Sequence, residues 1–342
     1  TEEALINNFF SRIFLILSFS SSSSLTHSPP QSGNLLVTML FQSSLDQHKL
    51  YDSLRHFPVS FTSPTHSSCL TYSLSPSSSP SYLCNHFVSP SSSSSVHCPT
   101  HYYSPLFIIP LLEYAVNVDR QIDCAQFVSQ NALGYCVTAT SSDSPQIRKL
   151  AYSALGRFAH RCRHQKTFAA RRQILLVLTA FRNAVVEPDM QINLLISLFV
   201  AESLLVMLRP THRMYAAMNA FYLQKPFLDL SDVPMFYSFF SSDSEHYRSQ
   251  RLWMIRLVRD SICVLGRRDK GEVVDEEVEE GVGKKRSARG RKMSKKEDRG
   301  RRDVVEILNK RHVFPLFFSF FDSSLSDGRA RLEILNVVRK VV

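Results

Sequence analysis

The 342-residue sequence is poor in glycine, and its cysteines lack the spacing of metal ligands. Only ten glycines occur, and no P-loop, dinucleotide-binding glycine pattern or G-x-S-x-G nucleophile turn is present. The seven cysteines include no C-x-x-C pair, so neither a zinc ribbon nor a disulfide scaffold is indicated. The sequence contains no run of 18 apolar residues, which is the length needed to span a bilayer. We therefore expect a non-enzyme that binds no metal, cofactor, membrane or small-molecule substrate.

Charge is scarce in the first 104 residues, which hold three Lys or Arg and four Asp or Glu. The other 238 residues hold 37 basic and 26 acidic residues, so their net charge is 37 − 26 = +11. All the excess positive charge therefore lies after residue 104.

Residues 1–104 are instead rich in serine and proline, with 29 Ser and 8 Pro. Serine clusters recur at Ser20–Ser24, Ser75–Ser81 and Ser89–Ser95. Such clusters supply no periodic apolar face, so we predict a disordered low-complexity segment and assign it no function. Its scattered aromatic residues suggest a hypothesis, that non-coding sequence was included in the gene prediction.

Residues 105–266 and 303–342 show helical periodicity. The clearest helix is predicted over Ser144–His164, with Ser144 as N-cap and Pro145 in the first turn. Its expected buried stripe is Ile147, Leu150, Ala151, Ala154, Leu155, Phe158 and Cys162. Further helices are predicted over Leu106–Val116, Asp119–Thr138, Ala169–Val186, Ile192–Leu208, Met214–Leu223, Val233–Phe240, Tyr247–Leu265, Val304–Phe321 and Arg329–Val341.

These helices recur about every 20 residues, so two consecutive helices make a pair of roughly the size used by HEAT and armadillo repeats. No alternating strand pattern competes with them. The predicted fold is therefore all-α, an armadillo- or HEAT-like α-solenoid in which each pair packs mainly on its neighbours.

A charged insertion, residues 267–302, interrupts the helical pattern. An acidic run is followed by basic residues that include Lys284, Lys285, Arg286, Arg289, Arg291, Lys292, Lys295 and Lys296. Blocks of like charge stay solvated, so we expect a flexible insertion. This basic tract is a candidate for binding nucleic acid or an import receptor, and a solvated loop without a partner is an equal alternative.

Two other patterns favour structure over chemistry. In His160–His164 two histidines lie one helical turn apart, but Cys162 faces elsewhere and no third ligand is suggested, which favours a surface pair. Arg248, Arg251, Arg256 and Arg259 alternate with Leu252, Ile255 and Val258, which indicates a core face with a basic outer stripe.

Three ordered blocks carry a family resemblance. They are MLRPTHRMYAAMNAFYLQKPFLDLSDVPMFYSFFSS at Met207–Ser242, YRSQRLWMIRLVRD at Tyr247–Asp260 and KRHVFPLFFSFFDSSLSDGRARLEIL at Lys310–Leu335. Together they resemble the C-terminal domain of the nucleolar pre-ribosomal-associated protein 1 family, the Urb/Npa-type ribosome biogenesis factors. The resemblance extends more weakly to Pro105 and does not include residues 1–104.

The residues that carry this resemblance are read as packing and turn residues. Asp232 is expected to cap a helix that begins at Val233 and Pro234, while Leu228 and Leu230 pin the preceding loop. An apolar helix should end at Asp322, and Trp253 is interpreted as a core anchor. Pro226, Asp229 and His312 complete this set.

The resemblance implies a non-catalytic nucleolar scaffold in large ribosomal subunit assembly, which supports pre-ribosomal RNA processing in early particles. Its partners would be pre-ribosomal proteins and pre-ribosomal RNA, and its localisation the nucleus and nucleolus. The alternative is a solenoid adaptor for protein partners outside the nucleolus, with the basic tract as a nuclear-localisation segment.

Overall fold

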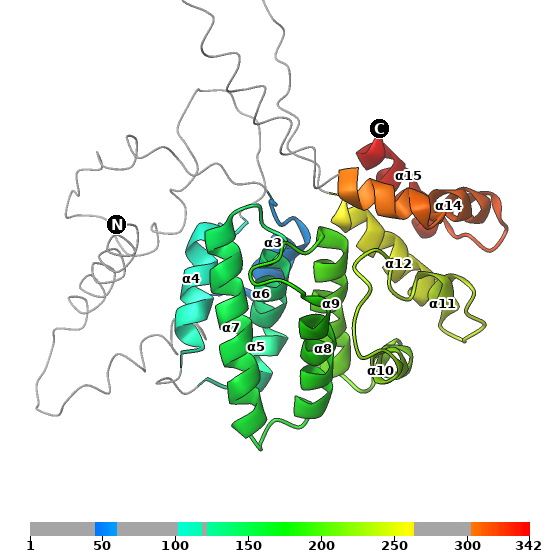
Figure 1. Cartoon of the computed structure of the whole chain (residues 1–342). Coiled ribbons are helices and arrows are strands. Elements are labelled where there is room, and N and C mark those ends of the chain that lie inside the picture. The colour runs from blue at the N-terminus through cyan, green and yellow to red at the C-terminus, as the bar shows by residue number, and fades with distance from the viewer. Residues whose placement is uncertain (1–44, 60–101, 118–121, 263–301) are drawn as a thin grey trace, which may run out of the picture. The chain divides into compact units, whose positions relative to one another are not determined.

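Figure 1 shows the computed structural model, which describes residues 45–59, 102–117, 122–262 and 302–342. Every regular element within these residues is helical, which confirms the all-α prediction for this part of the chain. The helices are α3 (Gln47–Arg55), α4 (Pro105–Ala115), α5 (Cys124–Ser129), α6 (Ala132–Ala139), α7 (Pro145–His164), α8 (Arg171–Ala184), α9 (Leu194–Leu208), α10 (Tyr215–Gln224), α11 (Phe236–Phe240), α12 (Tyr247–Ser261), α14 (Val313–Asp322) and α15 (Gly328–Val341). Residues 302–310 are also helical.

Short polar side chains begin several of these helices. Asp46, Asp123, Asn193 and Asp327 each accept a hydrogen bond from a backbone N–H of the first turn that follows. Ser144 occupies the N-cap of α7 as predicted, although its hydroxyl makes no capping bond. The predicted apolar stripe of α7 is buried, except for Leu150, which is half-buried.

Two predicted helices are each divided by a residue with left-handed backbone. The helix expected over Asp119–Thr138 is broken at Asn131, where φ is 67°, so that α5 and α6 are separate. The helix expected over Val304–Phe321 is broken at His312, where φ is 51°. The apolar pattern continues across both breaks, and neither Gly nor Pro marks them, which is why the sequence did not indicate them.

The helix predicted to begin at Val233 is shorter than expected. Met235 takes φ of 60°, and α11 begins only at Phe236. Asp232 therefore caps no helix. Its carboxylate accepts the N–H of the next residue, Val233, at 2.8 Å.

The centre of the fold is formed by α6 and α9. Every residue of α6 is buried, and α9 is apolar on nearly all its faces, so it packs against α5, α6, α8, α10 and α12. Gly134 of α6 allows a close approach by α3. A Cβ at Gly134 would lie 3.0 Å from Leu54 Cδ1 and 3.4 Å from Ala201 Cβ.

The prediction of disorder throughout residues 1–104 is wrong for residues 45–59. This segment forms α3, and Leu50, Leu54 and Phe57 are each at most 1% exposed. A local signal existed in the Asp46 cap and the spacing of these apolar residues, but the serine content of the surrounding segment obscured it. Residues 102–104 are also described, and the rest of 1–104 lies outside the described residues.

The C-terminal part is built from α12, α14 and α15. In Figure 1, α12 contacts α15, and α14 and α15 form a hairpin. The charged insertion of residues 267–302 lies outside the described residues, apart from Arg302. None of the described helices has the length and apolar character needed to span a membrane.

Candidate functional site where α3 meets α12

A cavity of about 320 Å³ lies among helices from distant parts of the sequence. Its walls are mixed, with charged groups from α3, α9 and α12 beside apolar ones. The lining residues are Tyr51, Arg55, Leu198, Glu202, His212, Arg213, Met214, Ser249, Leu252, Trp253, Arg256, Leu257 and Asp260.

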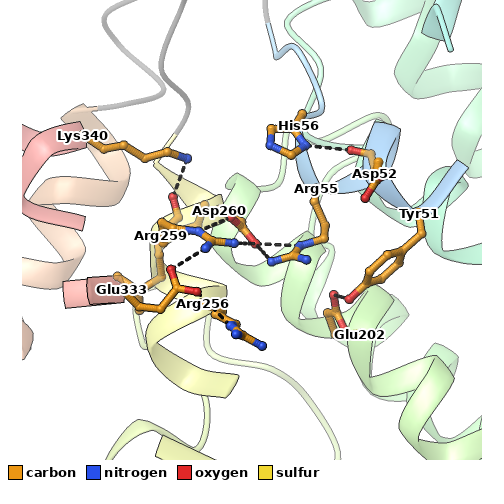
Figure 2. Close-up of polar contacts among 12 residues, drawn as sticks. Tyr51, Asp52, Arg55, His56, Glu202, Arg256, Arg259, Asp260, Glu333 and Lys340 are labelled. Carbon is orange, nitrogen blue, oxygen red and sulfur yellow. Dashed lines mark hydrogen bonds and ion pairs between the residues drawn. The ribbon is translucent and has the colours of Figure 1, made fainter. Parts of the chain in front are cut away.

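One wall is an ion pair between α3 and α12. Arg55 Nε donates to Asp260 Oδ2 at 2.7 Å, and a second guanidinium nitrogen contacts the same oxygen (Figure 2). Asp260 is only 6% exposed, so this carboxylate is held within the protein by its partners. Burial lowers the pKa of Arg55, but Asp260 outweighs it, and the pKa lies above the ordinary value.

Arg259 connects this carboxylate to α15. Arg259 Nε donates to Asp260 Oδ1 at 2.7 Å, and its Nη1 contacts Glu333. Arg256 Nε donates to Glu333 Oε1 at 3.0 Å (Figure 2). Burial would raise the pKa of Glu333, but hydrogen bonds from both arginines lower it. We call Arg55, Arg256, Arg259, Asp260 and Glu333 the brace.

A second carboxylate, that of Glu202, also lines the cavity and is bonded to a tyrosine. Tyr51 donates from its hydroxyl to Glu202 Oε1 at 2.6 Å, which joins α3 to α9 (Figure 2). Burial raises the pKa of Glu202, although Tyr51 and Arg55 partly offset it. Burial and the carboxylate of Glu202 likewise raise the pKa of Tyr51.

These groups stabilise contacts between helices and are poorly arranged for catalysis. Asp260 and Glu333 already bind arginines, and Glu202 accepts a hydrogen bond from the Tyr51 hydroxyl. The hydroxyl of the cavity serine, Ser249, accepts a hydrogen bond from Arg213 at 3.1 Å. The arrangement therefore links α3, α9, α12 and α15.

The loop of residues 226–234, singled out from the sequence, lies elsewhere and contacts α8 and α9. Asn183 Nδ2 donates to the carbonyl of Pro226 at 2.9 Å, and Asn193 Nδ2 donates to that of Leu230 at 2.7 Å. Leu228, Val233 and Pro234 are buried, so most of the expected packing is present.

Arg311 brings this loop to the last of the three sequence blocks. Its guanidinium lies 3.2 Å from Asp232 and 3.5 Å from Asp229, and its carbonyl accepts from Tyr237. Next to it, His312 supplies the helix break, and α14 ends at Asp322 as predicted. Arg311 thus holds the 226–234 loop against the segment that precedes α14.

Trp253 packs against buried aromatic residues of two other helices, although its own side chain is half-buried. Its ring lies 6.1 Å from Phe199 of α9 and 5.8 Å from Phe239 of α11, measured between ring centroids. In the basic stripe of α12, Arg256 and Arg259 bind Glu333, which supports a structural role for those two residues.

The paired histidines show no metal-site geometry. The rings of His160 and His164 lie 4.8 Å apart on the exposed side, and Cys162 is buried on the other. Among the described residues, no group of three or more His, Cys, Asp or Glu could hold a metal ion. The eight basic-tract candidates, Lys284 to Lys296, lie outside the described residues.

Sequence reasoning missed the brace and the Tyr51–Glu202 pair. Tyr51 and Arg55 belong to a segment expected to be disordered, and their partners lie 151 and 205 residues away. The amphipathic pattern of residues 46–57 could have revealed α3, but no sequence signal paired it with α12.

The comparisons with known proteins agree with the resemblance noted above. The family model described as nucleolar pre-ribosomal-associated protein 1 matches residues 133–271, which include α7 to α12. Over these residues the chain is similar to this family. The match begins within α6, so α3, which carries Arg55, lies outside it.

Two curated relatives carry the same name. The protein from Homo sapiens is 28% identical over 237 residues, and that from Mus musculus is 27% identical over 239 residues. The alignments cover 69% and 70% of this chain but only 9% of either relative. Their names support the expected nucleolar and nuclear localisation. No solved structure matches the chain.

Proposed function

We propose that this chain is a non-catalytic scaffold region that acts on nucleolar pre-ribosomal particles during assembly of the large ribosomal subunit. The similarity to this family carries the proposal, because the matching relatives are named for association with nucleolar pre-ribosomes. Its contribution to pre-ribosomal RNA processing would be structural, since the cavity groups are engaged in contacts between helices.

The proposed architecture is a segment of an armadillo- or HEAT-like α-solenoid. Consecutive helices α6, α7, α8 and α9 pack on one another in chain order, as stacked helical pairs do. Within this proposal, residues 105–266 and 303–342 form one helical domain, and residues 267–302 form a charged insertion in it. Solenoid surfaces suit protein partners and folded RNA of the particle.

Affinity purification of the tagged chain from nuclear extract tests the function. We expect large-subunit precursor RNA among the bound RNA at low salt, and less of it at high salt. Replacement of Lys284, Lys285, Arg286, Arg289, Arg291 and Lys292 by Gln should weaken RNA binding or nuclear entry without unfolding the helices. Absence of precursor RNA at both salt concentrations would reject the proposal in favour of an adaptor outside the nucleolus.

A further inference from the structure

The connection between α7 and α8 carries a dense group of cations on the folded part of the chain. From Ser144 to Val186 the sequence has nine Lys or Arg and no Asp or Glu. Five basic residues lie at the junction, and we call them the basic turn: Arg163, His164, Lys166, Arg171 and Arg172. The two helix ends that carry it meet at the lower end of this helical pair in Figure 1.

Contacts across the junction hold these residues together. Arg171 Nη1 donates to the carbonyl of Arg163 at 3.3 Å, and Phe168 is 5% exposed, which anchors the turn in the core. The pKa of Cys162, beneath the turn, is lowered first by a hydrogen bond from Cys124 and further by the charges of Arg171 and Arg163.

Three cations of the turn are exposed and lack an anionic partner among the described residues. Arg163, Lys166 and Arg172 are exposed, and none forms an ion pair within the part of the chain that the structure describes. An acidic residue in contact with the junction is Asp123, whose Oδ1 accepts a hydrogen bond from Gln165 Nε2 at 3.4 Å. Its Oδ1 already caps α5.

Helix stability explains only part of this arrangement. Arg163 and His164 lie in the last turn of α7, where cations interact favourably with the helix dipole. Arg171 and Arg172 begin α8, where the helix dipole disfavours cations. Folding therefore does not account for the cations of α8, and an external anion would.

We propose that the basic turn binds the phosphate backbone of RNA. The choice of RNA as the polyanion rests on the proposed function. The surface itself favours a nucleic acid over a protein, because no large apolar side chain is exposed between Ser144 and Arg172. Protein interfaces usually contain apolar or aromatic anchors, whereas contacts to phosphates need cations.

The test compares two sets of substitutions that remove equal charge. The turn variant is Arg163→Gln, Lys166→Gln and Arg172→Gln. The control is Arg182→Gln, Arg209→Gln and Arg329→Gln, three exposed arginines outside the turn. Both are made in the full chain and in the background that carries the six basic-tract substitutions, so that the tract cannot mask the turn. Circular dichroism confirms that each variant is folded.

Binding is measured by fluorescence anisotropy with an RNA duplex of about 20 base pairs, at about 50 and 200 mM salt. We expect the turn variant to bind at least roughly tenfold more weakly than the control, with a salt dependence reduced by about one per lost phosphate contact. Equal affinities of variant and control would overturn the proposal.

Poly-glutamate is the second probe and represents an acidic protein. Loss of poly-glutamate binding without loss of duplex binding would also overturn the proposal. Failure of the proposed function has a different result: the purified chain would still bind the duplex through the turn, but precursor RNA would be absent from the nuclear purification.

Discussion

The brace and the basic turn are both rich in arginine, yet they differ in surroundings. In the brace, Arg55 and Arg259 contact Asp260, and their side chains are only 22% and 21% exposed. In the basic turn, Arg163 and Arg172 are exposed, and no described carboxylate pairs with them. The same residue type thus joins helices in one region and is presented to solvent in the other.

The difference shows that a count of basic residues is a poor guide to a binding surface. The arginines of α12 are numerous, but Arg256 and Arg259 are occupied by Glu333. The useful quantity is the local balance of exposed charge after internal pairs are removed. By that measure, the basic turn is a stronger candidate than α12 for binding phosphate groups.

The largest expected effect comes from the packing that positions the brace. Leu54→Ala removes a buried side chain between α3 and α6, and we expect a loss of about 2–5 kcal/mol in the free energy of unfolding. Urea denaturation measures the change. Leu332→Ala is the matched control, because Leu332 is 59% exposed, and its effect should stay within about 0.5 kcal/mol. Equal effects would show that α3 does not pack on the core.

A smaller loss is expected when the brace itself is broken. Asp260→Asn leaves Arg55 and Arg259 without their carboxylate, and we expect the free energy of unfolding to fall by about 2–3 kcal/mol. The loss stays below that of a fully buried pair because both arginine side chains are partly exposed to solvent. Thermal and urea unfolding should agree. Asp243→Asn, at an exposed site, and the turn variant should each change stability far less. A turn variant as unstable as Asp260→Asn would end the distinction between the two regions.

The smallest effects concern acidity, and two carboxylates should respond in opposite directions. Because the pKa of Glu333 is lowered by folding, its ionised form stabilises the fold above the ordinary pKa, and this is lost as the pH falls through the lowered value. The cost of Glu333→Gln should therefore shrink on acidification.

The pKa of Glu202 is raised, so ionisation opposes folding as the pH rises from the ordinary value through the raised one. Glu202→Gln should gain stability relative to the parent over that rise. Unfolding curves between about pH 3 and 7 compare the two variants, and slopes of the same sign would contradict the assignment of these carboxylates.

Much of the helical part of the fold follows from local sequence. The helix α7 was predictable because its cap, its proline and its apolar stripe all lie within 21 residues. The breaks at Asn131 and His312 were not, because each depends on one residue with left-handed backbone inside a continuing apolar pattern. The local sequence therefore indicates that a helix is present more reliably than it indicates where that helix is broken.

The candidate site was much less predictable than the helices. Arg55 and Asp260 are 205 residues apart, and nothing in either local sequence selects the other as a partner. The Arg311 contacts with Asp229 and Asp232 also depend on tertiary structure, although both blocks are recognisable as sequence motifs. Pairing of charges is decided by the packed helices, which a single sequence does not specify.

The apolar character of α9 has a practical consequence for fragment design. A helix with hydrophobic residues on nearly every face has no side suited to water, so it needs α5, α6, α8, α10 and α12 around it. A recombinant fragment cut at the limits of the family match, residues 133–271, would lose α3, α4 and α5 and uncover part of α6 and α9. Soluble expression should therefore require a start before residue 45.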